Sequence, residues 1–269
     1  GSHAFFEAQQ KVYPRSINGF FMRWRWALVF FTQFVFYVVP WIQWGDRQMV
    51  LFDIGARRFY LFGMVLYPQD VIYLAALLII CALALFLFTA VAGRLWCGFS
   101  CPQTVYTEIF MWIEQKIEGD RSARIRLDNS SWTFEKIWKK SFKQFLWIAV
   151  SLWTGFTFVG FFVPIRDLGL EIVQLQGDWQ IFWVLFYGFA TYGNAGYLRE
   201  QVCKYMCPYA RFQSAMLDRD SLIVSYDPAR GEQRGPRRKG VDYKSQGLGD
   251  CIDCKLCVQV CPVGIDIRN

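Results

Sequence analysis

Four long apolar runs alternate with charged segments along the chain. A helix that crosses a bilayer core needs about 20 predominantly apolar residues. The runs of about this length are Trp24–Trp44, Val71–Ala92, Phe145–Val163 and Trp179–Leu198. Tryptophan and tyrosine gather at their ends, as they do at membrane–water interfaces. A single run of this kind could be the buried helix of a soluble protein, but four together indicate a membrane protein.

The composition agrees with this interpretation. Hydrophobic residues make up 54% of the 269 residues and aromatic residues 19%, whereas charged residues make up only 19%, against about 25% in globular domains. The sequence therefore predicts an all-α membrane protein with four transmembrane helices in residues 24–226, preceded by a cytoplasmic segment of residues 1–23.

Basic residues are unevenly divided between the connecting segments. The N-terminal segment through Arg25, residues 93–143 and the residues after Leu198 hold four, nine and twelve Lys and Arg, whereas loops 45–70 and 164–178 hold three and one. Because Lys and Arg concentrate in cytoplasmic loops, both ends of the chain are predicted to be cytoplasmic. This topology accounts for the net charge of +7, and no nucleic-acid partner is expected.

The chain also repeats itself weakly. Cys97-x3-Cys101-Pro102 follows the second run, and Cys203-x3-Cys207-Pro208 follows the fourth. Both pairs of runs start from the same side, so the sequence predicts two helical hairpins related as a parallel repeat. An approximate two-fold axis along the membrane normal would bring the two motifs face to face.

Each Cys-x3-Cys-Pro motif predicts a helix start. Proline is well accepted as the first helical residue, so Cys101 and Cys207 are expected at the N-caps of helices 102–117 and 208–217. A thiol at a helix N-terminus is stabilised as the thiolate. The cations expected to offset the thiolate charges are Arg94, Arg199, Lys204 and Arg211. Four converging thiolates could hold an iron–sulfur cluster or Cu(I), or act as redox-active dithiols without metal.

The sequence also suggests surroundings for Cys81 and for the helix after Cys101. Cys81, in the middle of the second run, is expected to be a buried small apolar residue. The helix after Cys101 is amphipathic, which suits either a position on the cytoplasmic interface or packing against the spans. Its apolar face holds Val105, Ile109, Trp112, Ile113 and Ile117, with Glu108, Glu114 and Lys116 elsewhere.

The strongest chemical signal is the run Cys251-x2-Cys254-x2-Cys257-x3-Cys261-Pro262. This spacing is typical of bacterial ferredoxins and predicts 4Fe-4S ligation. The alternative is a structural zinc site, which normally has two separated Cys-x2-Cys pairs. A disulfide framework is excluded because the predicted topology places these thiols in the reducing cytoplasm. Residues 227–250 form a basic, glycine-rich linker into this module, which covers residues 251–269.

Histidine chemistry is not expected. The only histidine is His3, within Gly1-Ser2-His3, which is typical of a cloning remnant.

In two-cluster ferredoxins the fourth cysteine of one run ligates the other cluster, yet no second run follows Cys261. The ferredoxin module is therefore expected to be truncated and only partly ordered.

Several motifs resemble those of a known family. Residues 96–105 (WCGFSCPQTV), 203–213 (CKYMCPYARFQ) and 117–121 (IEGDR) closely resemble the FixG/RdxA/CcoG-type accessory proteins of cbb3-type cytochrome oxidases, within the membrane polyferredoxins. The likeness covers nearly the whole chain after about residue 11. The resemblance implies a multi-pass protein of the bacterial inner membrane that reduces Cu(II) to Cu(I) while the oxidase is assembled.

The resemblance also implies roles for the cysteines and for partners. The membrane-side metal or catalytic site would be Cys97, Cys101, Cys203 and Cys207, and the cluster ligands would be Cys251, Cys254, Cys257 and Cys261. Expected partners are membrane lipid, oxidase-assembly and copper-transport proteins, and an unidentified cytoplasmic electron donor. Family members carry a second ferredoxin run, a further span and an immunoglobulin-like periplasmic domain. Two other functions stay open: a copper chaperone with a structural cluster, and an electron conduit to or from quinone.

The division of basic residues generates a topology prediction. Single cysteines introduced into loops 45–70 and 164–178 of a variant lacking the native cysteines should react with a membrane-impermeant maleimide added to intact cells. A cysteine introduced within residues 119–133 should react only after the cells are permeabilised. Protection of either of the first two loops in intact cells would contradict the four-span topology.

Overall fold

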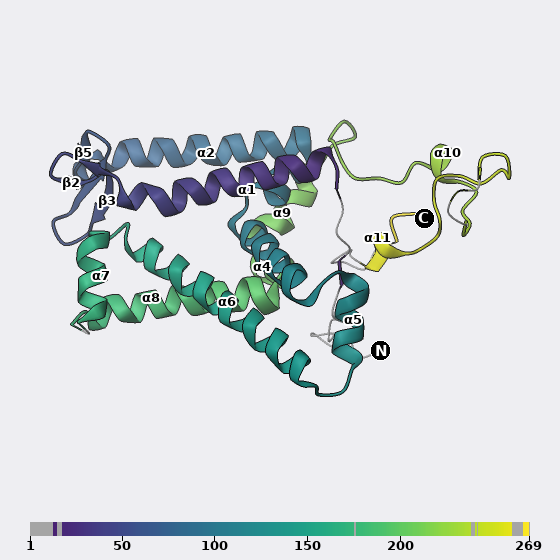
Figure 1. Ribbon diagram of the computed structural model, residues 1–269. Helices are drawn as coiled ribbons and strands as arrows, with labels where there is room; N and C mark the ends of the chain where they lie inside the picture. The colour runs from purple at the N-terminus through teal and green to yellow at the C-terminus, as the bar shows by residue number, and fades with distance from the viewer. Residues whose placement is uncertain are drawn as a thin grey trace, which may run out of the picture. The chain divides into compact units, whose positions relative to one another are not determined.

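The computed structural model describes residues 13–14, 18–174, 176–237, 240, 242–259 and 266–268, and only the backbone of residues 214 and 259. The chain divides into two compact units. One covers Ile17–Ser221, and the other joins Gly1–Ser16 to Leu222–Asn269. Most described residues of the larger unit are helical (Figure 1).

The helices of the larger unit are α1 (Phe20–Val38), α2 (Val71–Ala92), α3 (Leu95–Phe99), α4 (Pro102–Glu118), α5 (Arg121–Asn129), α6 (Phe134–Val159), α7 (Ile165–Val173), α8 (Asp178–Thr191) and α9 (Pro208–Met216). Two π-helices, Tyr192–Leu198 and Val202–Met206, lie between α8 and α9. Short 3-10 turns cover Val39–Trp41 and Pro68–Asp70. The smaller unit contains α10 (Pro228–Gly231) and α11 (Leu256–Gln259).

Two helices among the described residues are long and apolar enough to cross a membrane, judged by length and composition. They are Pro68–Ala92 and Phe134–Val159. The first predicted run is α-helical only to Val38 and continues as a 3-10 turn through Pro40 to Trp41. The fourth run is α-helical only to Thr191 and continues as a π-helix. The arrangement of four spans as a parallel repeat therefore stays a prediction.

The expectation of an all-α fold was wrong for residues 43–66. This segment forms two small antiparallel sheets, one of β1 (Gln43–Trp44) and β2 (Arg47–Gln48), the other of β3 (Val50–Asp53), β4 (Arg58–Leu61) and β5 (Met64–Leu66). The strands are rich in Val, Phe, Tyr and Leu, which favour a pleated surface. Each is only two to four residues long, too short to stand out beside the apolar runs.

Residues 43–66 are fastened to the turn that follows α6. The side chain of Gln48 is buried; its Nε2 donates to the carbonyl of Gly160 at 2.7 Å, and its Oε1 accepts from the amide of Ile165 at 3.1 Å. The amide of Phe52 donates to the carbonyl of Phe161 at 2.7 Å. Loops 45–70 and 164–178 are therefore held together at one end of the larger unit.

Helices α6 and α8 pack against each other through a glycine contact (Figure 1). A Cβ atom on Gly155 would lie 2.4 Å from the carbonyl oxygen of Val184 and 2.9 Å from the amide nitrogen of Gly188. Both neighbours are backbone atoms, which cannot move without shifting a helix. Only glycine at position 155 permits this approach, and it brings Val184 into a core cluster with Val159 and Leu168.

This contact predicts the effect of adding one methyl group. We expect Gly155→Ala to destabilise the protein by about 1–3 kcal/mol, the usual cost of overpacking a tight contact, visible as a lower Tm in detergent micelles. Gly169→Ala is the matched control, because its Cβ would meet only the Phe156 ring at 4.0 Å. Alanine is the better helix former, so Gly169→Ala should keep or raise the Tm. Equal Tm values for the two variants would contradict this account of the α6–α8 contact.

Candidate functional site

Both Cys-x3-Cys-Pro motifs cap helices, as predicted. Cys101 is the N-cap of α4 and Cys207 is the N-cap of α9, with extended backbones (φ −61°, ψ 129° and φ −84°, ψ 110°) and proline at the first helical position. The hydroxyl of Thr104, in the first turn of α4, donates to the carbonyl of Cys97 at 2.5 Å. The loop between the first pair of cysteines is thereby tied to the helix that follows it.

Two glutamine side chains connect the segments that carry the two motifs. Gln103, at the start of α4, donates to the carbonyls of Asn194 and Arg199 in the second half, at 2.9 and 3.1 Å. Gln213, in α9, donates in the opposite sense to the carbonyl of Gly93 at 3.4 Å and lies 3.8 Å from the Cys97 sulfur. Each glutamine follows one motif and binds backbone beside the other. The apolar pattern of the sequence gave no indication of these two glutamine contacts.

The four motif cysteines are electrostatic neighbours. Burial raises the pKa of Cys97 to about 11, and repulsion from Cys101, Cys203 and Cys207 acts in the same direction. Burial also raises the pKa of Cys203, with further contributions from Cys101, Cys207 and Glu200. In the described part of the chain, no group of three or more Cys, His, Asp or Glu is tight enough to hold a metal ion. Charge repulsion acts over longer distances than a ligand bond, so these sulfurs are neighbours without forming one ligand shell.

The two arginines that precede the motifs behave differently. Arg94 is close enough to Cys203 to lower its pKa, against the larger effect of burial. Arg199 was expected to do the same for its own motif, and its ion pair and hydrogen bond are with other groups. Its guanidinium binds the carboxylate of Glu114 at 3.0 Å and the carbonyl of Gly196 at 3.1 Å. It also lies 5.7 Å from the ring centre of Trp147. A buried carboxylate is the stronger partner for a guanidinium.

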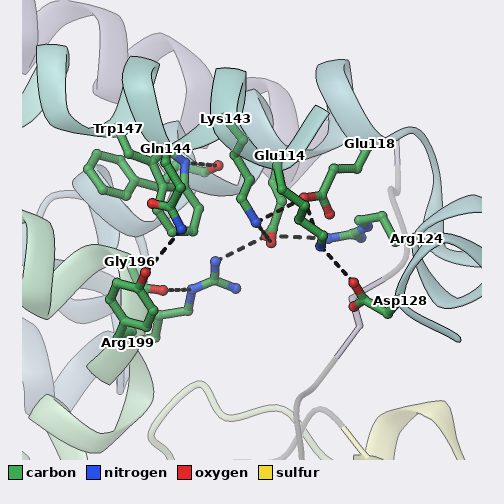
Figure 2. Close-up of polar contacts among 12 residues, drawn as sticks. Glu114, Glu118, Arg124, Asp128, Lys143, Gln144, Trp147, Gly196 and Arg199 are labelled. Atoms are coloured by element: carbon green, nitrogen blue, oxygen red, sulfur yellow. Dashed lines mark hydrogen bonds and ion pairs between the residues drawn. The ribbon is translucent and has the colours of Figure 1, made fainter. Parts of the chain in front are cut away.

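Glu114 belongs to a buried network of charges, which Figure 2 shows. Glu114 and Glu118 are one turn apart on α4 and are 1% and 2% exposed. Their ion pairs are Glu114 with Arg199 (3.0 Å), Lys143 (3.5 Å) and Arg124 (3.6 Å), and Glu118 with Lys143 (2.9 Å) and Lys140 (3.0 Å). Lys140 also binds Asp128 of α5 at 2.6 Å. The network joins α4, α5 and α6 to the turn before Cys203, so it positions both cysteine motifs.

The surroundings of α4 decide between the two interpretations of its amphipathic pattern. Its buried residues include Val105, Phe110 and Ile113 together with the three glutamates at 108, 114 and 118, whereas Trp112 is 46% exposed. Glu108 is buried beside Arg25 of α1, at 2.6 Å. Glu108 and Glu114 were expected away from the packed face, but cations on neighbouring elements pair with them there. The helix packs against other helices rather than presenting one apolar face to a surface.

Cys81 is exposed, so the expectation of a buried residue was wrong. It lies in α2, and none of the apolar 18-residue window of Pro68–Ala92 is buried inside the structure. The apolar character of this helix therefore does not reflect burial in a protein core.

The ferredoxin-like run is described for three of its four cysteines. Cys254 is exposed, Cys251 and Cys257 are half-buried, and Cys261 lies outside the described residues. Asp253 and Lys255, on either side of Cys254, have left-handed backbones (φ 53° and 55°). Left-handed residues are typical of backbone nests whose N–H groups bind anions, including iron–sulfur clusters. Cysteine thiolates at this spacing are the donor set that a 4Fe-4S cluster takes, so the residues present fit this group in donor chemistry. The three described cysteines of the run are not gathered into a group that could hold a metal ion.

The basic stretch before the run folds against it. The amide of Gly235 donates to the carbonyl of Cys251 at 3.2 Å, and the amide of Asp250 donates to the carbonyl of Arg230 at 2.8 Å. Arg268 pairs with Asp253, between two of the cysteines. Residues before and after the run thus contact it within the smaller unit.

The buried network predicts a large effect of one substitution. Glu114→Gln removes the carboxylate shared by Arg199, Lys143 and Arg124 and leaves buried cations partly unpaired. Breaking a buried ion pair in this way costs about 3–5 kcal/mol, so the midpoint of denaturant unfolding should fall markedly. Glu135→Gln is the matched control, because Glu135 pairs with Lys139 one turn away in an exposed position and such pairs contribute little. Similar midpoints for both variants would refute a structural role for the network.

Comparison with known proteins gives matches over both halves of the site. The 4Fe-4S binding domain family matches residues 74–119, which include Cys97 and Cys101. The 4Fe-4S dicluster domain family matches residues 198–269, which include the second motif and the ferredoxin-like run. No solved structure matches the chain.

Three curated relatives align with almost all of the chain. Protein RdxA of Cereibacter sphaeroides is 42% identical over 276 residues, covering 100% of this chain and 57% of RdxA. Nitrogen fixation protein FixG of Rhizobium meliloti is 41% identical over 271 residues (98% and 52%), and Protein RdxB of Cereibacter sphaeroides is 39% identical over 273 residues (99% and 57%). The chain thus spans between half and three fifths of these relatives' lengths. Homologous over its whole length to RdxA, FixG and RdxB and carrying two 4Fe-4S domain matches, the chain belongs to the FixG/RdxA-type family.

Proposed function

We propose that the chain is an inner-membrane oxidoreductase that passes electrons from a cytoplasmic 4Fe-4S module to the four-cysteine site and reduces Cu(II) to Cu(I). The cuprous ion would serve the assembly of a cbb3-type cytochrome oxidase. An iron–sulfur electron-transfer role follows from the 4Fe-4S domain matches and the family. The observation that carries the finer proposal is the mutual closeness of the Cys97, Cys101, Cys203 and Cys207 thiols.

The arrangement of the larger unit supports a membrane position with two distinct sides. Helices α2 and α6 have the length and composition of spans. Loops 45–70 and 164–178 are joined through Gln48, and the two cysteine motifs are joined through Gln103 and Gln213. In the proposed topology, the joined loops lie in the periplasm and the joined motifs at the cytoplasmic face, with both ends of this chain in the cytoplasm.

The chemistry of the residues suits electron delivery to copper. When bound, a 4Fe-4S cluster supplies one-electron transfer, and Cys251, Cys254, Cys257 and Cys261 would hold it. Reduction of Cu(II) to Cu(I) takes one electron and breaks no bond of the protein. Thiolates are soft ligands that select Cu(I), so the four motif cysteines favour the reduced ion. Binding of a cation there would also relieve the repulsion among the thiolates and release protons.

A second candidate for the four-cysteine site is a further iron–sulfur cluster. The 4Fe-4S binding domain match includes Cys97 and Cys101, which favours this candidate. The site would then relay electrons, and copper would bind elsewhere. The two candidates differ in what the motif cysteines hold, and this difference can be measured.

Single-turnover copper reduction tests the proposal. The protein is purified anaerobically, reduced, freed of reductant and mixed with Cu(II), and Cu(I) is measured with bicinchoninate after the mixture is quenched. We expect Cys254→Ser to abolish reduction while Cu(I) added directly still binds. Cys101→Ser and Cys207→Ser should abolish Cu(I) binding and leave the electron paramagnetic resonance signal of the ferredoxin-like module intact, because a serine hydroxyl is a poor partner for a soft ion.

Cys81→Ser is the matched control, because Cys81 is exposed on α2 and lies outside all three motifs. It should behave as the unmodified protein in both measurements. Loss of iron and sulfide from the Cys101 and Cys207 variants would assign the site to a relay cluster. Undiminished copper reduction by Cys254→Ser would remove the ferredoxin-like module from the path.

A further inference from the structure

Gln213 is a buried glutamine whose side-chain amide lies beside a motif sulfur. It belongs to α9, the helix that follows Cys207, and it is 2% exposed. Its Nε2 atom is 3.4 Å from the carbonyl oxygen of Gly93 and 3.8 Å from the sulfur of Cys97. The helix that begins at the second motif therefore carries a hydrogen-bond donor to the first motif.

The surroundings of the Gln213 amide fix which of its atoms faces Cys97. The carbonyl oxygen of Gly93 can only accept a hydrogen bond, so the amide nitrogen must point toward it and the amide oxygen must point away. An amide nitrogen carries two protons. One proton is donated to Gly93, and the second is available to the Cys97 sulfur.

Contacts between α9 and the end of α2 hold Gln213 in this position. Carbonyls at the end of a helix have no partner within it, and Gln213 supplies a donor for Gly93, the C-cap of α2. The hydroxyl of Tyr209, in the first turn of α9, is hydrogen-bonded to the hydroxyl of Thr89 in α2. Thr89 is 1% exposed, so this contact lies inside the protein. Packing of α9 on α2 thus places the donor before any metal ion binds.

The strength of an N–H···S contact depends on the state of the sulfur. A neutral thiol is a weak acceptor, whereas a hydrogen bond to an ionised group is about twice as strong as one between neutral groups. Metal ligation requires the thiolate and releases the thiol proton to solvent. The contact from Gln213 to Cys97 therefore contributes more when Cys97 holds a metal ion than when it is a free thiol.

We propose that Gln213 is a positioning residue of the copper site, which donates an N–H···S hydrogen bond to Cys97 and thereby strengthens the binding of Cu(I). This inference rests on the proposed function, because it takes the four motif cysteines as the site that receives the copper ion. The site carries one more negative charge with Cu(I) than with Cu(II), so a donor to the sulfur favours the reduced ion. Hydrogen bonds around a copper-binding cysteine sulfur tune redox potentials in other copper proteins.

Titration of the full chain with Cu(I) tests the proposal. The protein is purified anaerobically in lipid nanodiscs with its iron–sulfur content intact, and Cu(I) is added in competition with bicinchoninate to obtain Kd. Gln213→Met keeps the side-chain length and removes both amide protons. We expect it to bind Cu(I) about tenfold more weakly, the smaller of the effects typical for loss of a group that supports a metal ligand. Gln213→Leu, a second apolar replacement of different shape, should give the same loss.

A spectroscopic measurement reports on the sulfur itself. In the ultraviolet difference spectrum on Cu(I) addition, the sulfur-to-copper charge-transfer band of Gln213→Met should move to longer wavelength. The reason is that the thiolate lone pair rises in energy when its N–H donor is removed. Loosening of the fold without loss of this contact would lower the Tm and leave the band in place.

Two double variants separate the direct contact from a general effect on the site. In a Cys97→Ser background the accepting sulfur is gone and three motif thiols remain, so Gln213→Met should change the Cu(I) Kd by less than about twofold. Cys203→Ser is the matched control background, because Cys203 has the same place in the second motif. There, Gln213→Met should still weaken Cu(I) binding about tenfold.

The outcomes distinguish this inference from the proposed function. Unchanged Kd values for both Gln213 variants would overturn the inference and leave the proposed function standing. A tenfold loss that persists in the Cys97→Ser background would also overturn it, since the effect would not pass through that sulfur. Failure of the unmodified protein to bind Cu(I) would overturn the proposed function together with this inference.

Discussion

The arrangement of the larger unit depends on two carboxylates that are buried one turn apart on α4. An ionised carboxylate inside a protein is costly unless cations and hydrogen bonds surround it. Glu114 and Glu118 are paired with cations only when α5, α6 and the turn before Cys203 are all in place, because these cations come from all three. The need to neutralise two side chains thus fixes the positions of several segments at once. Since Cys101 is the N-cap of α4, the same requirement sets where the first motif lies relative to the second.

The positions of these segments determine which charged groups lie near the four thiols. Burial raises the pKa of Cys97, and the repulsion from Cys101, Cys203 and Cys207 raises it further, because ionisation of one thiol disfavours ionisation of the others. Arg94 is the nearby cation that acts on Cys203, while Arg199 is committed to Glu114. A bound metal ion is a far larger source of positive charge than one arginine, so a cation beside these sulfurs would offset their mutual repulsion.

Much of this site could be predicted from the sequence, because it depends on local rules. The N-cap positions of Cys101 and Cys207 follow from the proline after each cysteine, and the ferredoxin-like run is recognisable from spacing alone.

Partners far apart in the sequence could not be predicted. The pairing of Glu114 with Arg199 spans 85 residues, and the bond from Gln48 to the amide of Ile165 spans 117. Hydrophobic periodicity placed Glu114 away from the packed face of α4, because periodicity indicates only where apolar residues are buried. It does not detect a buried carboxylate whose charge is neutralised by cations from other segments. The strands of residues 43–66 were missed for a different reason: their pairing is local, but each is too short to give a clear period.

The π-helix Tyr192–Leu198 gives the site a dependence on chain length. A π-helical turn closes its hydrogen bond one residue later than an α-helical turn, so it holds an additional residue between α8 and the second motif. Each residue of an α-helix advances the chain by about 100° around the axis. The same residues wound as an α-helix would turn further around the axis and would carry Arg199 away from Glu114 and Cys203 away from the first motif. In this part of the chain, the number of residues constrains the site as strongly as their identity.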